Sequence, residues 1–552
     1  MPVFHPLPSR NRPLLWICFG LHLLAALPAP AQPTAFDPGF SGNGELENPF
    51  PTLATPVRDR VFQRMGLDHQ QRILIAGREE TLPGNIRSLY AGRLLADGSI
   101  DPTFATSGLY QSEWGDDLYV RDLAVLPDGS AYLCASSESA SYLLRFLDNG
   151  ALDTQFVDPV AQTAGYLRLE PFVCDSVEVL AGGRVLVAAS ERLGPNQYRA
   201  AVRVFLASGA PDPGFAGTGV QYLNQGRLTL AAAEQTGRGI LVATLPFLGG
   251  QLQLIRLNMD GSLDDSFQPI LVEDVDSTAF NGGDALGVHP DGRIRLTLPR
   301  YNEPRVSNEL WPRDGAAQPD VNGFFTPASS PADRLSFGAV TEGPDGRTLI
   351  GNVLRKAPDN CRRTQHFQHL TRRLYGVSGF QLPGDTSFAP QEGQYAWYPS
   401  QPLFNFSNCN EGVIAFRDVA LQRDGRILIL SSIQQDWQKP LLTRLQGNAF
   451  VAAPWDVAPA AMSFPAASDR PYTTVTSDVV IVDGLGTDVQ VPAYALGALL
   501  SLNYGPYRDA PLWVKNGDVL RLRTTAPAQS GQSRTASLFV GGIRGKNSWA
   551  SL

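Results

Sequence analysis

The feature that most constrains the fold of this sequence is a short turn motif, Asp-x-x-Phe, that recurs along most of the chain. Copies begin at Asp37, Asp101, Asp153, Asp212, Asp264 and Asp385, and a degenerate copy ends at Phe325. Successive phenylalanines of the motif are separated by 64, 52, 59, 52, 58 and 63 residues. A nearly constant period of this length is typical of repeat proteins, in which each unit supplies one supersecondary element. The chain therefore contains seven copies of one unit.

A second landmark, a glycine-centred hairpin, follows the turn motif. It occurs at Gly129, Gly183, Gly237, Gly292, Gly346 and Gly425, with a degenerate copy, HQQRILIAG, from His69. Short segments that alternate or run apolar flank each hairpin, and no unit carries a helical period. Glycine adopts a positive φ without a Cβ clash, which suits a tight turn between two strands. Units of about 59 residues with four short strands each, over residues 36–450, predict a seven-bladed β-propeller.

The landmarks also resemble those of a known family. FDPGFSGNG from Phe36, IDPTFATSG from Ile100, PDPGFAGTG from Pro211 and LDDSFQP from Leu263, together with the PDG hairpins, resemble the delta-60 repeat of secreted bacterial proteins. The resemblance covers about 415 residues and weakens in the fifth to seventh units, where WPRDGAAQPD from Trp311 replaces the expected segment. It implies a propeller-like array and carries over no catalytic residue.

The pattern changes after an Ala/Pro-rich stretch at residues 451–468. The segments VTSDVVIVDGLG from Val475 and VKNGDVLRLRTTAPAQSGQSRTASLFVGG from Val514 predict a small β-sandwich and resemble bacterial immunoglobulin-like surface modules. We therefore expect an all-β chain with five parts: a signal peptide (1–31), a seven-unit propeller (32–455), a linker (456–467), an immunoglobulin-like sandwich (468–545) and a tail (546–552).

The first 31 residues have the layout of a secretory signal. Arg10 and Arg12 precede an apolar run from Leu14 to Leu27, and the small residues Ala29 and Ala31 frame a cleavage site. The run is too short to span a bilayer, which needs roughly 20 apolar residues, and a retained membrane anchor is the alternative. We expect a mature chain that is secreted, periplasmic or at the cell surface and has no membrane span.

Cysteine content agrees with an oxidising compartment, because four cysteines remain after the signal and no CxxC motif occurs. Cys361 and Cys409 lie in one local insertion and are the preferred disulfide. Cys134 and Cys174 either pair across neighbouring units or remain buried thiols.

The insertion is also the predicted ligand-binding region. The landmark glycines are spaced 54, 55 and 54 residues apart from Gly183 to Gly346, but the next step, to Gly425, is 79 residues, so about 25 residues are extra. Long loops on a rigid scaffold often carry binding residues. We expect arginines for anionic groups and aromatic rings for stacking on sugar or peptide, at Arg362, Arg363, Arg372, Arg373, Tyr395, Trp397 and Tyr398. The alternative is that the insertion has no binding role and is an added loop held by one disulfide.

Metal binding has little support in the sequence. His366 and His369 are suitably spaced to meet on a helical face, but no third zinc ligand lies nearby. The aspartate of each turn either caps the turn through a backbone N–H or joins neighbouring carbonyls around calcium, and we favour the cap. No cofactor is expected, with calcium as the alternative.

The functional prediction is a non-catalytic binding or surface scaffold. The GxSxG, HExxH and Rossmann glycine motifs are missing from the sequence, which favours a non-enzymatic chain without deciding the question. The formal charge is −8 and no region is strongly basic, which argues against nucleic acid as a partner. An extracellular glycan, a peptide or a surface protein is the expected partner. A carbohydrate-active hydrolase or lyase is the first alternative, and a structural cell-envelope protein is the second.

Overall fold

The computed structural model of the chain describes residues 34–541, except for positions 51–56, 82–85, 113–116, 236, 248, 276–284, 290–291, 300–305, 317–318, 320, 326–333, 344–347, 357–364, 374–393, 398–412, 435–437, 448–456, 458, 466–469, 488 and 530–531. Every named element within these ranges is a β-strand, which confirms the all-β prediction. None of the described residues forms a helix long and apolar enough to cross a membrane.

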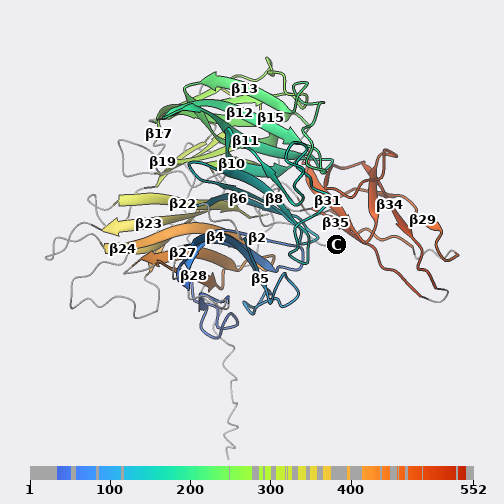
Figure 1. Ribbon diagram of the computed structural model, residues 1–552. Coiled ribbons are helices and arrows are strands. Elements are labelled where there is room, and N and C mark those ends of the chain that lie inside the picture. Colours follow the sequence, from blue (N-terminus) through green and yellow to red (C-terminus); the bar gives the residue numbers. More distant parts are fainter. Residues whose placement is uncertain are drawn as a thin grey trace, which may run out of the picture.

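Seven four-stranded antiparallel sheets follow one another along the chain (Figure 1). The first contains β2 (Val57–Leu67), β3 (Ile73–Thr81), β4 (Ile86–Leu94) and β5 (Leu109–Gln111). The second contains β6 (Tyr119–Val125), β7 (Ala131–Ser136), β8 (Ser141–Phe146) and β9 (Tyr166–Arg168). The third contains β10 (Phe172–Val179), β11 (Val185–Gly194), β12 (Gln197–Phe205) and β13 (Val220–Gln225). The fourth contains β14 (Arg227–Gln235), β15 (Gly239–Pro246), β16 (Gly250–Leu257) and β17 (Ile270–Val275).

The remaining three sheets of this series have the same strand order. The fifth contains β18 (Leu286–Val288), β19 (Ile294–Pro299), β20 (Val306–Trp311) and β21 (Val321–Phe325). The sixth contains β22 (Arg334–Glu342), β23 (Thr348–Lys356), β24 (Gln365–Arg373) and β25 (Gln394–Trp397). The seventh contains β26 (Val413–Leu421), β27 (Ile427–Gln434), β28 (Gln438–Leu445) and, from the start of the chain, β1 (Glu45–Glu47).

The structural unit is offset by one strand from the sequence unit. A repeat unit counted from its Asp-x-x-Phe turn includes the strand that follows the turn, here Leu109–Gln111, with the later strands. In the structure this strand, β5, pairs instead with β4 before it. Each strand that follows an Asp-x-x-Phe turn thus completes the sheet that precedes the turn, as β9, β13 and β17 also do. The first turn lies at Asp37, so its strand β1 has no earlier sheet and pairs with β28 instead.

The contacts between sheets return to their starting point. The first strands β2, β6, β10, β14 and β18 each contact the next in this series, and β22 contacts β19. β26 contacts both β22 and β2, so the seventh sheet lies beside the first. Across this junction the backbone N–H of Met65 donates to the side-chain Oδ2 of Asp418 at 2.9 Å.

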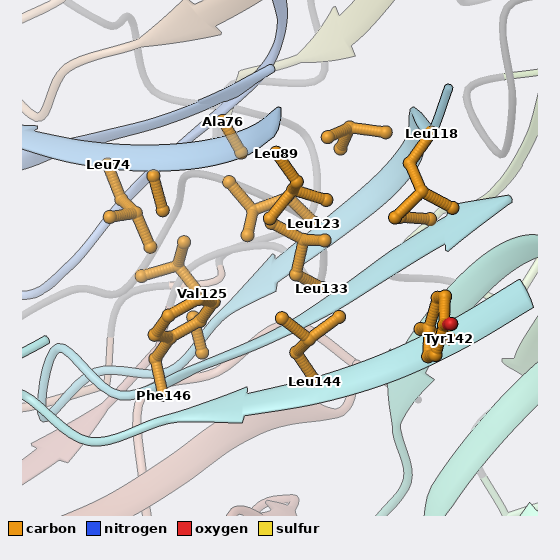
Figure 2. Packing of buried hydrophobic residues seen from close by; sticks show 14 of the residues in the cluster. Leu74, Ala76, Leu89, Leu118, Leu123, Val125, Leu133, Tyr142, Leu144 and Phe146 are labelled. Carbon is orange, nitrogen blue, oxygen red and sulfur yellow. The ribbon is translucent and has the colours of Figure 1, made fainter. Parts of the chain in front are cut away.

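A buried phenylalanine from the turn motif fills the space between neighbouring sheets. Phe104 has no exposed surface and belongs to a core cluster with Leu74 and Leu89 of the first sheet and Leu123 and Leu144 of the second. Figure 2 shows these four leucines facing one another. The same arrangement recurs at Phe40, Phe156, Phe215 and Phe267, each of which is at most 4% exposed. Burial of so large a ring is strongly stabilising, which explains why the motif recurs.

An arginine connects each of these turns to the next sheet. Arg93 lies with its Nε 2.7 Å from Asp101 Oδ2, and both side chains are almost wholly buried. Its guanidinium carbon lies 4.9 Å from the centre of the Phe104 ring, and its Nη1 donates to the backbone oxygen of Asp148 in the second sheet at 2.5 Å. Three other arginines, Arg145, Arg256 and Arg444, likewise pair with the aspartate of their own turn and donate to a backbone oxygen beside the next sheet. In the third sheet Arg184 makes the same two kinds of contact.

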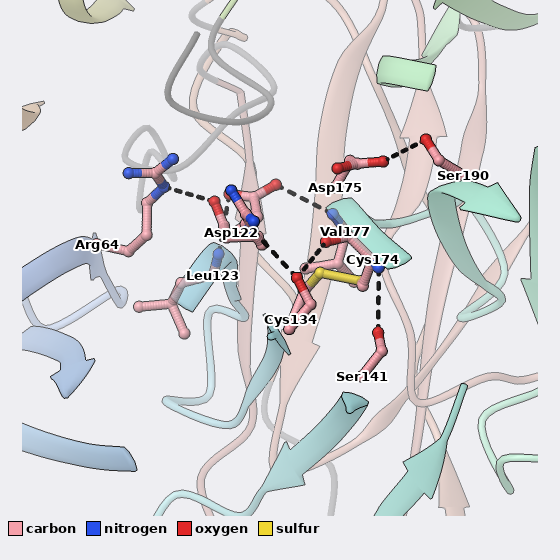
Figure 3. Close-up of a disulfide and its surroundings, with 11 residues drawn as sticks. Arg64, Asp122, Leu123, Cys134, Ser141, Cys174, Asp175, Val177 and Ser190 are labelled. Carbon is pink, nitrogen blue, oxygen red and sulfur yellow. Dashed lines mark hydrogen bonds between the residues drawn. A yellow bond between two sulfur atoms is a disulfide. The ribbon is translucent and has the colours of Figure 1, made fainter. Parts of the chain in front are cut away.

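A disulfide joins the second and third sheets. Cys134 on β7 and Cys174 on β10 are bonded, 40 residues apart in sequence, and both are fully buried (Figure 3). Of the two alternatives for these residues, pairing across neighbouring units is confirmed. The other predicted pair, Cys361 and Cys409, lies outside the described residues.

The C-terminal strands form two further sheets. One contains β29 (Thr474–Thr476), β30 (Val480–Ile481), β32 (Leu499–Leu502) and β34 (Val519–Thr525), and the other contains β31 (Val491–Leu496), β33 (Leu512–Val514) and β35 (Ser537–Val540). The two sheets enclose one apolar core, which also includes Val457 from the segment assigned to the linker. Figure 1 shows β31 and β35 near the seven-sheet body and β29 and β34 farther from it.

The C-terminal sheets contact hairpin turns of the seven-sheet body. The Tyr494 hydroxyl donates to Asp128 Oδ2 in the turn between β6 and β7 at 3.2 Å. Gly182 N, in the turn between β10 and β11, donates to the backbone oxygen of Pro511 at 3.0 Å. The glycine hairpins of the second and third sheets thus provide both a tight turn and a docking surface.

Candidate functional site

Six of the seven sheets carry an extra residue at the same place in their first strand. The pairing between first and second strands slips by one residue, so that one residue of the first strand faces no partner in the second strand. These bulged residues are Gln63, Arg121, Asp175, Leu230, Gly338 and Arg417. Bulges re-aim side chains and are over-represented beside functional sites. The six bulged residues are therefore candidates for a functional site.

The polar bulged residues occur in four neighbouring sheets. The seventh, first, second and third sheets are consecutive neighbours, and they carry Arg417, Gln63, Arg121 and Asp175. The bulged residues of the fourth and sixth sheets are apolar. We call these four residues, together with Arg64 next to Gln63, the polar arc. Figure 3 shows Arg64 and Asp175 of this arc near the disulfide.

Serines hold two arginines of the polar arc in place. Arg121 Nε donates to Ser136 Oγ at 3.1 Å, and Arg417 Nε donates to Ser432 Oγ at 3.2 Å. Each serine lies on the second strand of the same sheet as its arginine. Neither arginine forms an ion pair with a carboxylate of the described residues. Because Nε is already used, the two terminal nitrogens of each guanidinium remain for another partner.

The ring of Tyr119 lies beside two arginines, Arg78 and Arg121. The guanidinium carbons of Arg78 and Arg121 lie 4.2 and 6.0 Å from the ring centre. Arg64 Nε donates to the backbone oxygen of Arg121 at 2.7 Å. Arg78 is neutralised by Asp117, whose Oδ1 lies 2.6 Å from its Nη1. Two guanidinium groups therefore lie beside the ring of Tyr119, which is 39% exposed.

Burial and two nearby arginines act on the pKa of Arg417 in the same direction. Burial lowers the pKa of Arg417 to about 10, and the nearby positive charges of Arg64 and Arg78 lower it further in the same direction. A guanidinium keeps its proton even when buried, because its intrinsic pKa is very high. For Arg417 desolvation is the main cause of the lowered pKa, and the nearby Tyr119 acts in the opposite direction.

Asp175 is the single acidic member of the polar arc. Burial raises the pKa of Asp175 to about 6, while the charge of Arg121 and a hydrogen bond from Ser190 Oγ, at 2.8 Å, act in the opposite direction. A carboxyl of this kind changes charge near neutral pH, whereas an ordinary aspartate is ionised far below it.

This shift predicts a pH-dependent stability. The pKa of Asp175 is about 6 in the folded chain, against an ordinary value of 3.8, so the folded state binds the proton more tightly and gains stability as the pH falls through 6 toward 4. We expect Asp175→Asn, which keeps an acceptor for Ser190, to be more stable than the wild type by about 1 to 3 kcal/mol at pH 8 and equal to it near pH 4. Urea unfolding at both pH values measures this difference, and a constant difference would contradict the assignment.

The residues predicted from the insertion are only partly described. Arg372 and Arg373 lie on β24, and Tyr395 and Trp397 lie on β25, in the sixth sheet. Backbone pairing sets Tyr395 opposite Leu370, so Tyr395 and Arg372 occupy positions on the same face of the sheet. Arg362, Arg363 and Tyr398 lie outside the described residues.

The two histidines of the insertion also lie on β24 rather than on a helix. His366 pairs with Arg355 and His369 with Asn352 in the neighbouring strand. The helical face on which the two histidines would have met does not exist, because both residues lie on a strand.

The aspartates of the turns act as caps. Asp101 Oδ1 accepts from the backbone N–H of Thr103 at 3.0 Å, while its Oδ2 faces Arg93. The same bond from the residue two positions on, at 2.9 Å, occurs at Asp37, Asp153, Asp212 and Asp264. The described ranges contain no cluster of three or more His, Cys, Asp or Glu side chains arranged for a metal ion.

Comparison with known proteins bears on the fold. A family model described as a domain of unknown function (DUF5122) beta-propeller matches residues 249–267, which cover β16 and its Asp-x-x-Phe turn. The chain is a β-propeller protein. No curated protein sequence matches the chain at a significant level.

Solved structures give distant likenesses. One is a subtype N10 neuraminidase-like protein of A/little yellow-shouldered bat/Guatemala/060/2010, with 12% identity and a TM-score of 0.32, covering 56% of this chain and 94% of that chain. Another is prolyl oligopeptidase B from Galerina marginata, with 8% identity and a TM-score of 0.33, covering 68% of this chain and 56% of that chain. A protein of unknown function from Dyadobacter fermentans has 11% identity and a TM-score of 0.35, covering 73% of this chain and all of that chain (100%). Likenesses at this level carry no argument about activity.

Proposed function

We propose that the chain is an exported, non-catalytic binding scaffold. In this proposal the seven four-stranded sheets are the blades of a seven-bladed β-propeller of the delta-60 repeat type, and the C-terminal sheets are an immunoglobulin-like sandwich docked on its hairpin turns. The pairing of β1 with β28 supports the ring, because it joins the two ends of the series of sheets. The disulfide between Cys134 and Cys174 supports export, because such bonds persist in oxidising compartments.

The observation that carries the binding role is the contrast between two sets of charged groups. The aspartates and arginines of the turns are paired with each other and join one sheet to the next, as Arg93 and Asp101 do. Arg121 and Arg417 in the polar arc are instead held by serines and form no ion pair within the described ranges. A rigid body whose first strands hold two guanidinium groups through neutral serines is suited to binding.

The hydrolase or lyase alternative requires a second carboxyl. Glycosidases use two carboxyl groups about 5 to 10 Å apart. Asp175 is the one acidic residue of the polar arc, and its neighbour on β6, Asp122, is occupied by the backbone N–H groups of Leu123 and Val177. The arc therefore supports binding better than glycoside hydrolysis.

An array experiment tests the binding role. We expect the mature chain to bind members of a panel of acidic and neutral oligosaccharides and peptides, and to leave them unchanged after prolonged incubation. Mass spectrometry of the recovered ligands measures turnover. Cleaved products would contradict the non-catalytic proposal and favour the hydrolase or lyase.

A further inference from the structure

We propose that the contact between the C-terminal sheets and the seven-sheet body is a pH-sensitive latch, in which Asp128 of the body and Asp509 of the C-terminal sheets share the Tyr494 hydroxyl. Two carboxylate charges loosen the latch at neutral pH, and the loss of one charge at acidic pH tightens it. The inference goes beyond the binding role proposed above and does not depend on it, because it rests on contacts between two parts of this chain.

The C-terminal sheets are held by turns and side chains rather than by strand pairing. None of their described strands pairs with a strand of the seven-sheet body. Contacts come from the turn between the first and second strands of each of the first three sheets: His69 with Phe539, Asp128 with Tyr494, and Gly182 with Pro511. A junction of this kind opens without disrupting a sheet, so a few side chains decide how often it is closed.

One hydroxyl serves two carboxylates at this junction. Tyr494 is 4% exposed, and its oxygen lies 3.2 Å from Asp128 Oδ2 and 3.4 Å from Asp509 Oδ1. Burial and the two carboxylates raise the pKa of Tyr494, so the hydroxyl stays protonated. A phenol has one proton and donates it to one carboxylate at a time. The two negative charges therefore lie close together across the boundary between the two parts of the chain, where they repel each other.

Asp509 is the member of the latch that titrates. Partial burial and the charge of Asp128 raise the pKa of Asp509, and the opposing effects of the Tyr494 hydrogen bond and of Arg145 are smaller. Asp509 remains accessible to solvent, which supplies and removes its proton. When the sheets separate, burial and Asp128 no longer act on it, and its pKa returns toward the ordinary value. The docked state thus binds the proton more tightly, and docking gains stability as the pH falls through the raised pKa.

Other charged and titratable groups surround the latch. They are Arg145 on β8, Tyr132 on β7, Arg72 and Asp148 beside the turn at Gly129, Arg508 beside the turn at Gly182, and His69 in the turn of the first sheet. Arg145 is paired with Asp153 at 3.0 Å, and Arg72 with Asp148 at 2.6 Å. His69 packs on Phe539 and is the second group of the junction whose charge depends on pH, so the test must separate it from Asp509.

Hydrogen exchange resolved to single amides measures how often the latch opens. The Gly182 amide donates across the junction to Pro511, whereas the next amide, Gly183, donates to Leu180 within its own turn and is the internal control. Dividing each rate by the intrinsic rate of an unprotected amide removes the direct effect of pH on exchange. We expect the protection of Gly182 relative to Gly183 to be about three- to thirtyfold higher at pH 4.5 than at pH 8, since one unit of pKa shift is a factor of ten. An equal ratio at both pH values would overturn the proposal.

Three single variants assign the effect to this contact. Asp509→Asn and Asp128→Asn each remove one charge and keep a side chain of the same shape, so each should raise the protection of Gly182 at pH 8 and flatten its pH dependence. The double variant should add little to either, because the two charges act on each other. Tyr494→Phe keeps the buried ring but removes the shared donor, and should lower the protection of Gly182 at pH 8 by about tenfold.

The control is Asp478→Asn, the same charge change at an exposed residue between β29 and β30, which should behave as the wild type does. A pH dependence that persists in Asp509→Asn would assign it to another group, such as His69, and would overturn the latch. An equal loss of pH dependence in Asp478→Asn would also overturn it. The binding and turnover results on the array decide the scaffold role separately, because no ligand enters the exchange experiment.

Discussion

Replacement of Phe104 by alanine should lower the free energy of unfolding by about 3 to 5 kcal/mol. The ring has no exposed surface and lies in the cluster that joins the first and second sheets. Alanine removes both the apolar contacts and the ring beneath the Arg93 guanidinium, so a cavity remains at the junction of two sheets. Urea or thermal unfolding followed by circular dichroism measures the loss.

A matched control separates this effect from a general sensitivity to substitution. Val160→Ala removes apolar atoms from a side chain that is 91% exposed, and we expect it to change stability by less than about 0.5 kcal/mol. A loss of less than about 1 kcal/mol in Phe104→Ala would mean that the ring does not hold the two sheets together.

Removal of the disulfide should cost a similar amount. The bond between Cys134 and Cys174 closes a loop with a sequence separation of 40 residues, which corresponds to about 4 kcal/mol in the chain-entropy account. Both sulfur atoms are buried between the second and third sheets, so the double variant Cys134→Ala, Cys174→Ala also loses packing there. We expect its midpoint in urea to fall accordingly.

Reductant provides the companion measurement. Added dithiothreitol should lower the midpoint of the wild type toward that of the double variant and affect the variant much less. Equal midpoints for the oxidised wild type and the double variant would contradict a stabilising role of this bond.

The repeat and the role of its turn could be predicted from the sequence because they depend on local chemistry. An aspartate followed two residues later by a free N–H is a turn cap wherever it occurs, and Asp101 and Asp212 behave in this way. The phenylalanine that follows is buried in each of the five described copies from Phe40 to Phe267, as expected for a large ring at a regular spacing.

The grouping of strands into sheets could not be predicted in the same way. Whether Leu109–Gln111 belongs to the sheet before it or after it depends on a pairing between strands, and the residues of the strand fit both choices. The closing pair β1 and β28 joins residues about 400 positions apart, so the local sequence holds no signal for it.

The polar arc was missed because its residues lie inside strands, where a charged residue is usually taken for the solvent-facing side. A signal was nevertheless present, since Arg121, Asp175, Gly338 and Arg417 each lie eight residues before a landmark glycine, at Gly129, Gly183, Gly346 and Gly425. Gln63 lies eight residues before Gln71, which has a positive φ of 62° in the degenerate first hairpin. This position, eight residues before the landmark, is polar in some units and apolar in others.

The central claim, that the chain closes on itself through β1 and β28, is tested most directly by cross-linking these strands. Glu45 lies opposite Thr443, and the flanking bonds from Arg444 N to Gly44 O and from Asn48 N to Pro440 O leave Glu45 and Thr443 as a non-hydrogen-bonded pair, whose Cα atoms lie close enough for a disulfide. In the double variant Glu45→Cys, Thr443→Cys, peptide mapping should find the two new cysteines bonded to each other, whereas Glu45→Cys combined with Val160→Cys should leave both free. Free thiols at Cys-substituted positions 45 and 443 in the folded chain would contradict a closed ring.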